Sequence, residues 1–383
     1  MKKSFMLICI MTILLYCGPK SNKVEKITEG GKEVVLNHIE PYEIKGVSLT
    51  FSLEQEFTID MENEDITEIG IVDIYGFDID SEGNIFIFGP PLRSDNHIFK
   101  FDKYGEFIKA FGPKGQGPGE IQFPVYLKIN SKDELPIVDV YGSKLLIFNK
   151  EGEVISEIKL EQNFPLVYPL ENGNYLIVRV EPDVSGEFGF QILSVYDSNF
   201  KEIKEIDKFR NNYPLKANKF KLPQDNFWWT ISSKGNIYVG NTERGYEISV
   251  CNLEGRLIRI IRKEFNPVPV SDELKKAALG PFPEDHPMRK TLYFADHMPP
   301  FEFFFLDDKE RLFVLTAEKE GDNRIYDIFN EEGTFIGRKA LNISFNSFNR
   351  YGNQVIIRNK RLVCVQEKES SFKELLIYKM TWQ

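Results

Sequence analysis

The 383-residue sequence contains few of the residues on which most catalytic and metal-binding motifs are built. It has four cysteines and four histidines. No CxxC pair, HExxH motif or GxSxG nucleophile elbow occurs, so neither a zinc site nor a hydrolase has a motif to support it. A chain so poor in cysteine must also be held together by side-chain packing rather than by a framework of disulfide bridges.

Positive charge is in deficit as well. The chain has 48 lysine and arginine residues against 58 aspartate and glutamate residues, which gives a formal net charge of −10. No basic stripe offsets this charge locally, so a phosphate backbone would be repelled and we expect no nucleic-acid partner. Aromatic residues are abundant instead, with 32 phenylalanines and 16 tyrosines, and these favour β-strands.

The N-terminus has the pattern of a bacterial signal peptide. Lys2 and Lys3 precede the uncharged run SFMLICIMTILLY, which is too short to span a bilayer comfortably. Its end, LLYCG, resembles a lipobox, in which Cys17 would become the lipid-modified first residue of the mature chain. Tyr16 departs from the Gly, Ala or Ser usual at that position. We predict a signal peptide over 1–17 and an exported protein anchored in the cell envelope through Cys17, with plain secretion or an uncleaved anchor as alternatives.

Residues 18–45 are predicted to form a flexible tether. The stretch GPKSNKVEKITEGGKEVV is small, polar and charged, and its apolar residues follow no helical or strand period. Such a composition buries too little apolar surface to order a segment by itself.

From residue 46 onward the sequence repeats itself. Turns rich in Gly and Asn connect the strands of β-hairpins because these residues tolerate positive φ. Six segments combine such a turn with an apolar strand: DIDSEGNIFIF (78–88), INSKDELPIVD (129–139), PLENGNYLIVR (169–179), ISSKGNIYVGN (231–241), LDDKERLFVLT (306–316) and NRYGNQVIIRN (349–359). The first also resembles a calcium loop, but no flanking helices or position-12 acid accompany it, so we interpret it as a hairpin turn.

A second signature follows five of these hairpins. It consists of an apolar strand, an Asp/Asn-x-x-Gly turn and a strand that alternates apolar with charged residues, as in HIFKFDKYGEFIKAF (97–111). The alternation is typical of an outer, water-facing strand, whereas runs such as FEFFFLD fit inner strands covered on both sides. The sixth unit lacks one strand, and the unassigned strand GVSLTFSLEQEFTI (46–59) would complete it. The two ends of the chain would then close a ring and remove its open edge.

These motifs resemble the six-bladed β-propeller lipoproteins related to NHL repeats. The resemblance is carried by Asp-x-x-Gly-Asn-Ile-Phe/Tyr-Ile, by Phe-Asp-Lys-x-Gly-x-Phe and by the glycine-rich stretch that follows, all within 76–124. It implies an all-β fold over 46–383, a six-bladed β-propeller of four-stranded antiparallel blades whose last blade is completed by the N-terminal strand. It implies little about a ligand.

The glycine-rich stretch AFGPKGQGPGEIQFP (110–124) could be mistaken for a phosphate-binding loop. A P-loop requires GxxxxGK[ST] between a strand and a helix, but no GK[ST] occurs and the following IQFPVYLKI is another strand. We interpret Gly112 to Gly119 as the connector from the outer strand of one blade to the inner strand of the next, where tight bends require Gly and Pro.

Two connectors are longer than the ring requires, namely 208–226 and 266–300. Long irregular loops in compact folds are often functional. In the second, Ser271 fits a helix N-cap before DELKKAAL and Gly280 a stop, so a short helix is predicted to lie over the upper face as a partial lid. His286 and His297 in this loop are candidate ligand-binding residues, with exposed structural histidines as the plainer interpretation.

Aromatic side chains near the inner strands are the other candidates for ligand binding. Trp228 and Trp229 are adjacent on one predicted inner strand, so they face opposite ways. With Tyr126 and Tyr168 from other blades they form either ordinary core or a platform for a sugar or peptide.

Two functions remain open from the sequence. The first is a non-catalytic, membrane-tethered binding or scaffold lipoprotein, a monomer without cofactor, that presents its upper face to a peptide, glycan or protein. The second is a metal-dependent enzyme resembling propeller lactonases or lyases, with one divalent cation on the axis. The acids available for that cation are Asp73, Asp225 and Glu302.

Overall fold

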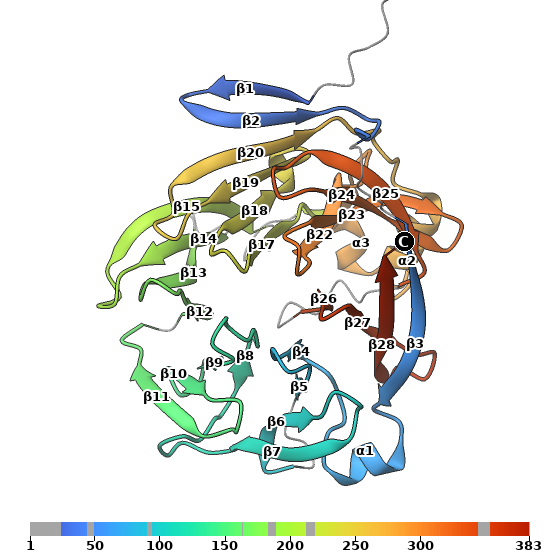
Figure 1. The fold of residues 1–383 in the computed structure, drawn as a ribbon. Helices are drawn as coiled ribbons and strands as arrows, with labels where there is room; N and C mark the ends of the chain where they lie inside the picture. Colours follow the sequence, from blue (N-terminus) through green and yellow to red (C-terminus); the bar gives the residue numbers. More distant parts are fainter. Residues whose placement is uncertain are drawn as a thin grey trace, which may run out of the picture.

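Six antiparallel sheets surround a common axis in the computed structural model, which describes residues 24–43, 50–89, 94–162, 164–182, 189–211, 219–343 and 353–382 (Figure 1). Each sheet is one blade, and its first strand lies nearest the axis. The predicted six-bladed β-propeller is therefore confirmed. No helix within these ranges is both long and apolar enough to cross a membrane.

The blades follow one another in chain order. The first three consist of β4 (Gly76–Ile79), β5 (Ile85–Phe88), β6 (Asn96–Phe101) and β7 (Phe107–Pro113); β8 (Pro124–Val125), β9 (Leu135–Asp139), β10 (Lys144–Phe148) and β11 (Val154–Lys159); and β12 (Leu166–Pro169), β13 (Tyr175–Pro182), β14 (Gly189–Tyr196) and β15 (Glu202–Asn211).

The other three blades are built in the same way. They consist of β17 (Phe227–Ile231), β18 (Ile237–Asn241), β19 (Glu247–Cys251) and β20 (Leu257–Lys263); β22 (Phe301–Leu306), β23 (Leu312–Glu320), β24 (Asn323–Phe329) and β25 (Phe335–Leu341); and β26 (Val355–Arg358), β27 (Arg361–Glu367), β28 (Lys373–Trp382) and β3 (Phe51–Asp60).

The ring is closed by β3, the strand predicted from the N-terminal segment. It pairs antiparallel with β28, from Phe51 opposite Trp382 to Asp60 opposite Glu374. The last blade thus combines strands from both ends of the chain. This confirms the predicted closure and leaves no blade with an unmatched neighbour.

Apolar side chains fill the six junctions between neighbouring blades. On β5, Ile85 and Ile87 pack towards the sixth blade while Phe86 and Phe88 pack towards the second, because successive strand residues face opposite ways. Each junction has its own cluster of buried residues. Most inner-strand residues in these junctions are apolar because neighbouring blades cover both faces of each sheet.

The hairpin turns show why the repeated Asp/Asn-x-x-Gly pattern recurs. In the first blade the carboxylate of Asp80 accepts from the backbone N–H of Glu82 (3.0 Å) and of Asn84 (2.8 Å). Gly83 has a φ of +90°, which disfavours side chains with a Cβ. These short turns lie on one side of the ring, which we call the lower face.

The opposite side, the upper face, carries the connectors between blades. The glycine-rich connector leads from β7 to β8, as predicted, and Asp139 fixes its end by accepting from the backbone N–H of Gln122 (3.0 Å) and Phe123 (2.9 Å). Short helices also occur outside the blades: α1 (Glu64–Glu68) between β3 and β4, and a 3₁₀ turn (Thr242–Arg244) between β18 and β19.

Residues 25–43 form an ordered segment, which we call the strap, and the prediction of a flexible tether is wrong for this part of 18–45. The strands β1 (Glu25–Glu29) and β2 (Lys32–Asn37) form a hairpin, and β2 pairs in parallel with β20 at the outer edge of the fourth blade (Figure 1). The backbone of β20, with Val34 and Val35 fully buried, supplies the order that the strap's own composition lacks.

The strap is fixed to two blades by one buried side chain. The amide nitrogen of Asn37 donates to the carbonyls of Arg262 (3.2 Å) and Gly333 (3.0 Å), and its amide oxygen accepts from the N–H of Phe335 (2.7 Å). Tyr42 then donates its backbone N–H to the carbonyl of Phe335 (2.9 Å). The strap therefore crosses from the fourth blade to the fifth before the chain enters the sixth.

Replacing Asn37 with Ala should destabilise the ring by about 2–4 kcal/mol, because three buried backbone groups lose their partner. The measurement is the urea midpoint of unfolding. Asn199→Ala, at an exposed turn, is the matched control and should change stability by less than about 0.5 kcal/mol. Equal midpoints for the two variants would contradict a clamping role for the strap.

Candidate functional site

Between β20 and β22 the chain forms a long projection, the arm (residues 264–300). Its helix α2 (Asp272–Leu279) begins where predicted, because the Ser271 side chain accepts from the N–H of Leu274 (3.2 Å). The arm continues through α3 (Pro287–Thr291) and β21 (Leu292–Phe294). The arm returns to the ring at β22.

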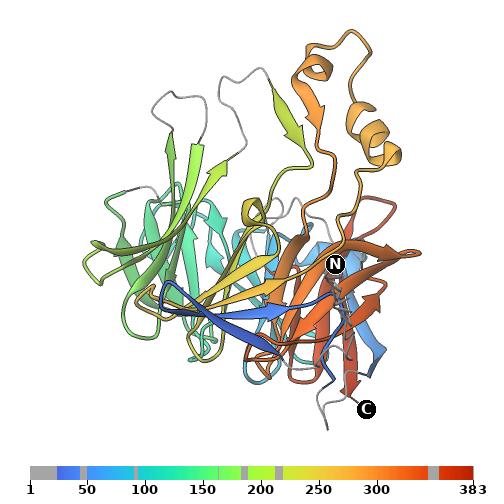
Figure 2. The same cartoon turned by 90° about the horizontal axis from the view of Figure 1, so that it is seen from above.

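The arm stands upright on the upper face and does not cover the axis. Its strand β21 pairs in parallel with β16 (Phe220–Leu222), which belongs to the other long connector. Figure 2 shows this pair and both helices rising from the ring, and Figure 1 shows the helices beside the fifth blade. The predicted lid over the central opening is therefore wrong, because pairing with β16 holds the arm upright.

The two candidate histidines have local roles in the arm. His286 is the N-cap of α3, where its Nδ1 accepts from the N–H of Met288 (3.2 Å), and its ring lies 5.1 Å from that of Phe282. His297 is exposed, and its backbone forms a bridge with Pro269. The structure does not bring these histidines to the predicted aromatic residues.

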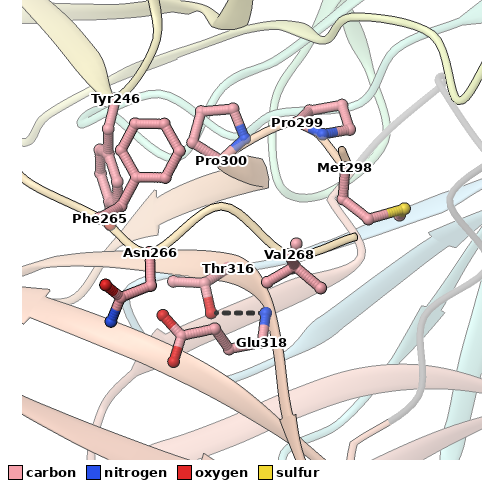
Figure 3. A pocket seen from close by; sticks show the side chains of 10 residues that line it. Tyr246, Phe265, Asn266, Val268, Met298, Pro299, Pro300, Thr316 and Glu318 are labelled. Atoms are coloured by element: carbon pink, nitrogen blue, oxygen red, sulfur yellow. Dashed lines mark hydrogen bonds between the residues drawn. The ribbon is translucent and has the colours of Figure 1, made fainter. Parts of the chain in front are cut away.

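A small cavity lies at the base of the arm, between its two ends and the fifth blade (Figure 3). Phe265, Val268 and Met298 line it from the arm, and Thr316 and Glu318 line it from β23. Its volume of about 10 Å³ is room for roughly one water molecule, so it is a packing gap and not a ligand site.

Trp228 is part of the core between the fourth and fifth blades. Its indole Nε1 donates to the carbonyl of Phe304 (2.8 Å), and its ring lies 5.7 Å from that of Phe303. A tryptophan with its one donor satisfied inside a blade junction has a packing role. The plainer of the two interpretations therefore fits Trp228.

The other three predicted aromatic residues meet near the axis. The ring of Tyr126, from the second blade, lies 5.4 Å from that of Trp229 in the fourth blade and 6.4 Å from that of Tyr168 in the third. Tyr126 has a φ of +61°, and β8 ends just before it. A bulky residue held in the left-handed region is strained, and strain of this kind is concentrated at functional sites.

Charged side chains that the sequence analysis did not single out lie beside these rings. The ammonium of Lys128 donates to the hydroxyl of Thr230 (3.1 Å) and to the carbonyl of Ile231 (3.2 Å), both in the fourth blade. Burial lowers the pKa of Lys128 to about 8, partly offset by the negative charge of Asp78. The signal in the sequence was a lysine inside VYLKI, an otherwise apolar inner-strand run.

Asp78 and Arg358 complete this group. Asp78 is buried and accepts from the backbone N–H of Ile129 (2.7 Å) and of Ile79 (2.8 Å), and its carboxylate lies 3.7 Å from the guanidinium of Arg358. Burial raises the pKa of Asp78, and Arg358 and these hydrogen bonds oppose that effect. We call the group the axial cluster: Asp78, Tyr126, Lys128, Tyr168, Trp229 and Arg358.

A family model described as a six-bladed β-propeller, DUF5128, matches residues 59–258, which is more than half of the chain. The chain belongs to this family. No curated protein matches its sequence.

Among solved structures, a Bacteroides fragilis protein described as exported has a TM-score of 0.51 and 13% identity, covering 91% of this chain and 99% of its own. This likeness supports the propeller fold alone. A DUF4221 protein from Bacteroides vulgatus has a TM-score of 0.48 and 10% identity (87% and 99% covered), and a virginiamycin B lyase from Staphylococcus aureus has 0.42 and 13% (87% and 100%).

The three acids considered as metal ligands are not gathered in this propeller. Each is paired with a base: Asp73 with Lys373 (2.8 Å), Asp225 with Lys221 (2.8 Å) and Glu302 with Arg324. Across the described ranges no group of three His, Cys, Asp or Glu side chains is placed to hold a metal ion. Asp73, Asp225 and Glu302 therefore do not form a binding site for a cation on the axis.

The lowered pKa of Lys128 makes the stability of this propeller depend on pH in a defined direction. The pKa of a lysine in the unfolded chain is about 10.4. Between pH 8 and this value the folded protein therefore binds fewer protons than the unfolded chain, and its free energy of unfolding rises with pH. The wild type should gain stability relative to Lys128→Met between pH 7 and pH 10. Urea unfolding of both proteins at each pH measures this, and a difference that is independent of pH would contradict it.

Proposed function

We propose that the protein is an exported, lipid-anchored β-propeller that binds a peptide, glycan or protein partner with its upper face and catalyses no reaction. The observation that carries this proposal is the asymmetry of the ring. Apart from the strap at the outer edge, the long elements outside the regular blades, namely β16 and the arm, rise from the upper face, while the lower face has short turns (Figure 2). Extended loops on a rigid scaffold are the usual position of binding residues.

Side chains on the upper face supply contact surface of the kind that interfaces use. Tyr141 is 70% exposed beside the ring of Phe123 (5.0 Å), and Tyr293 is 47% exposed on the arm. Val180 is 52% exposed near the end of β13. Exposed aromatic residues are enriched at protein interfaces and also stack on sugars.

The strap limits how far the ring can stand from an anchored Cys17. The strap begins at Glu25, so seven residues separate it from Cys17 rather than the 28 of the predicted tether. Seven fully extended residues span at most about 25 Å. An anchored Cys17 would therefore hold the outer edge of the fourth blade within about 25 Å of the membrane surface.

Lipid anchoring predicts that cells fed a labelled fatty acid incorporate the label into the wild type but not into Cys17→Ser. The wild type should fractionate with membranes, and the unprocessed or secreted variant should lack the mature lipidated form, since multiple acyl chains anchor stably. Cys9→Ser, within the signal sequence, is the control and should retain the label. A labelled Cys17→Ser protein would refute the assignment.

Binding through the upper face predicts that photo-crosslinking depends on the face probed. A benzophenone amino acid in place of Tyr293 on the arm should give a discrete crosslinked species in cells. The same replacement at Tyr104, which is 65% exposed in a lower-face turn, should not. Equal crosslinking from both positions, or from Tyr104 alone, would overturn the proposal.

A further inference from the structure

The ammonium of Lys128 lies near the axis with only neutral partners. It donates hydrogen bonds to the Thr230 hydroxyl and the Ile231 carbonyl, at the end of β17 that leads into a lower-face turn. Among the described residues no carboxylate lies within 4 Å of it, so it forms no ion pair there. An ammonium has three donors, so this one retains capacity for an anion.

Two cations share one nearby carboxylate in this region. Asp78 is 3.7 Å from Arg358, and its negative charge also acts on Lys128. The other acid that acts on Lys128 is Glu310 of the fifth blade, whose Oε1 is already bonded to the backbone N–H of Ser233 (2.9 Å). Within the six residues of the axial cluster, protonated Lys128 and Arg358 face one carboxylate, that of Asp78, and Glu310 adds a second negative charge from outside the cluster.

The side of the axis next to Lys128 is aromatic and reached by solvent. All five residues of β17 keep part of their surface exposed, although β17 is the innermost strand of its blade. The buried residues of β4 show the opposite pattern. Trp229 and Tyr126 are both half-buried, and their rings lie 5.4 Å apart.

We propose that the axial cluster binds a small organic carboxylate, with its anionic group between Lys128 and Arg358 and its apolar part against Trp229 and Tyr126. Such a ligand supplies the negative charge that the two cations lack, and it covers aromatic surface that now faces solvent. Charge-assisted hydrogen bonds to a carboxylate are about twice as strong as neutral ones. The site is distinct from the upper-face surface and does not depend on the proposed function.

Benzoate is a suitable probe because it combines a carboxylate with a flat apolar ring. Isothermal titration calorimetry of the mature protein without its lipid should detect benzoate binding at pH 7. Lys128→Met should weaken this binding by about 10- to 100-fold, the loss expected for a charge-assisted hydrogen bond. Benzyl alcohol, which lacks the charge, should bind the wild type more weakly by a similar factor.

Lys100→Met is the matched control. Lys100 is also a buried lysine beside an aromatic ring, with its ammonium bonded to the carbonyl of Lys150 (2.8 Å), but it belongs to β6 and lies away from the axis. This variant should bind benzoate as the wild type does. Thermal unfolding of both variants checks that a loss of binding reflects the site and not the fold.

A pH series provides a second readout. Benzoate affinity should fall as pH rises through about 8, because Lys128 loses its proton there, with Asp78, Arg358 and Glu310 as the charged groups that act on it. Absence of benzoate binding, equal binding by Lys128→Met, or binding of inorganic phosphate as tight as that of benzoate would overturn the proposal. None of these results bears on crosslinking from the arm.

Discussion

Pairing between β3 and β28 is the constraint on which the rest of the structure depends. Each blade covers only one face of its neighbour. An open row of six blades would therefore leave one apolar face exposed on the first blade and another on the last. Closing the ring converts these faces into a sixth junction, where Ile59 and Ile377 are buried with residues of the first blade. Because β3 precedes all other blade strands in the chain and β28 is the last of them, the sixth blade is complete only when strands from both ends of the chain pair.

The strap, like β3, is ordered by pairing with a strand from a distant part of the chain, here β20 at the outer edge of the fourth blade. A hairpin with exposed polar residues cannot stay ordered alone, but β20 offers an open edge and Asn37 joins the strap to the next blade. The hairpin covers an edge that would otherwise be free to pair with another chain. Order in 25–43 therefore results from ring assembly and not from local sequence preference.

Local patterns were sufficient to predict the blades, the closure and α2, because each depends on residues close together in the sequence or on counting strands. The strap was missed although the Gly30-Gly31 pair, both at positive φ, is a hairpin signal. Its parallel pairing with β20 depends on residues more than 200 positions away. Similarly, the arm's direction depends on β16 meeting β21, and the axial cluster depends on five blades meeting near the axis.

The axial cluster shows that polar and charged residues can occupy the innermost strands of a propeller and the residues next to them. Charges buried between blades are paired or hydrogen-bonded there, as Asp327 is with Arg338 (2.6 Å) and Lys100 with the carbonyl of Lys150 (2.8 Å). The innermost strands also border the axis, where water reaches Lys128 and Trp229. A lysine remains there with neutral partners, and burial lowers its pKa to about 8.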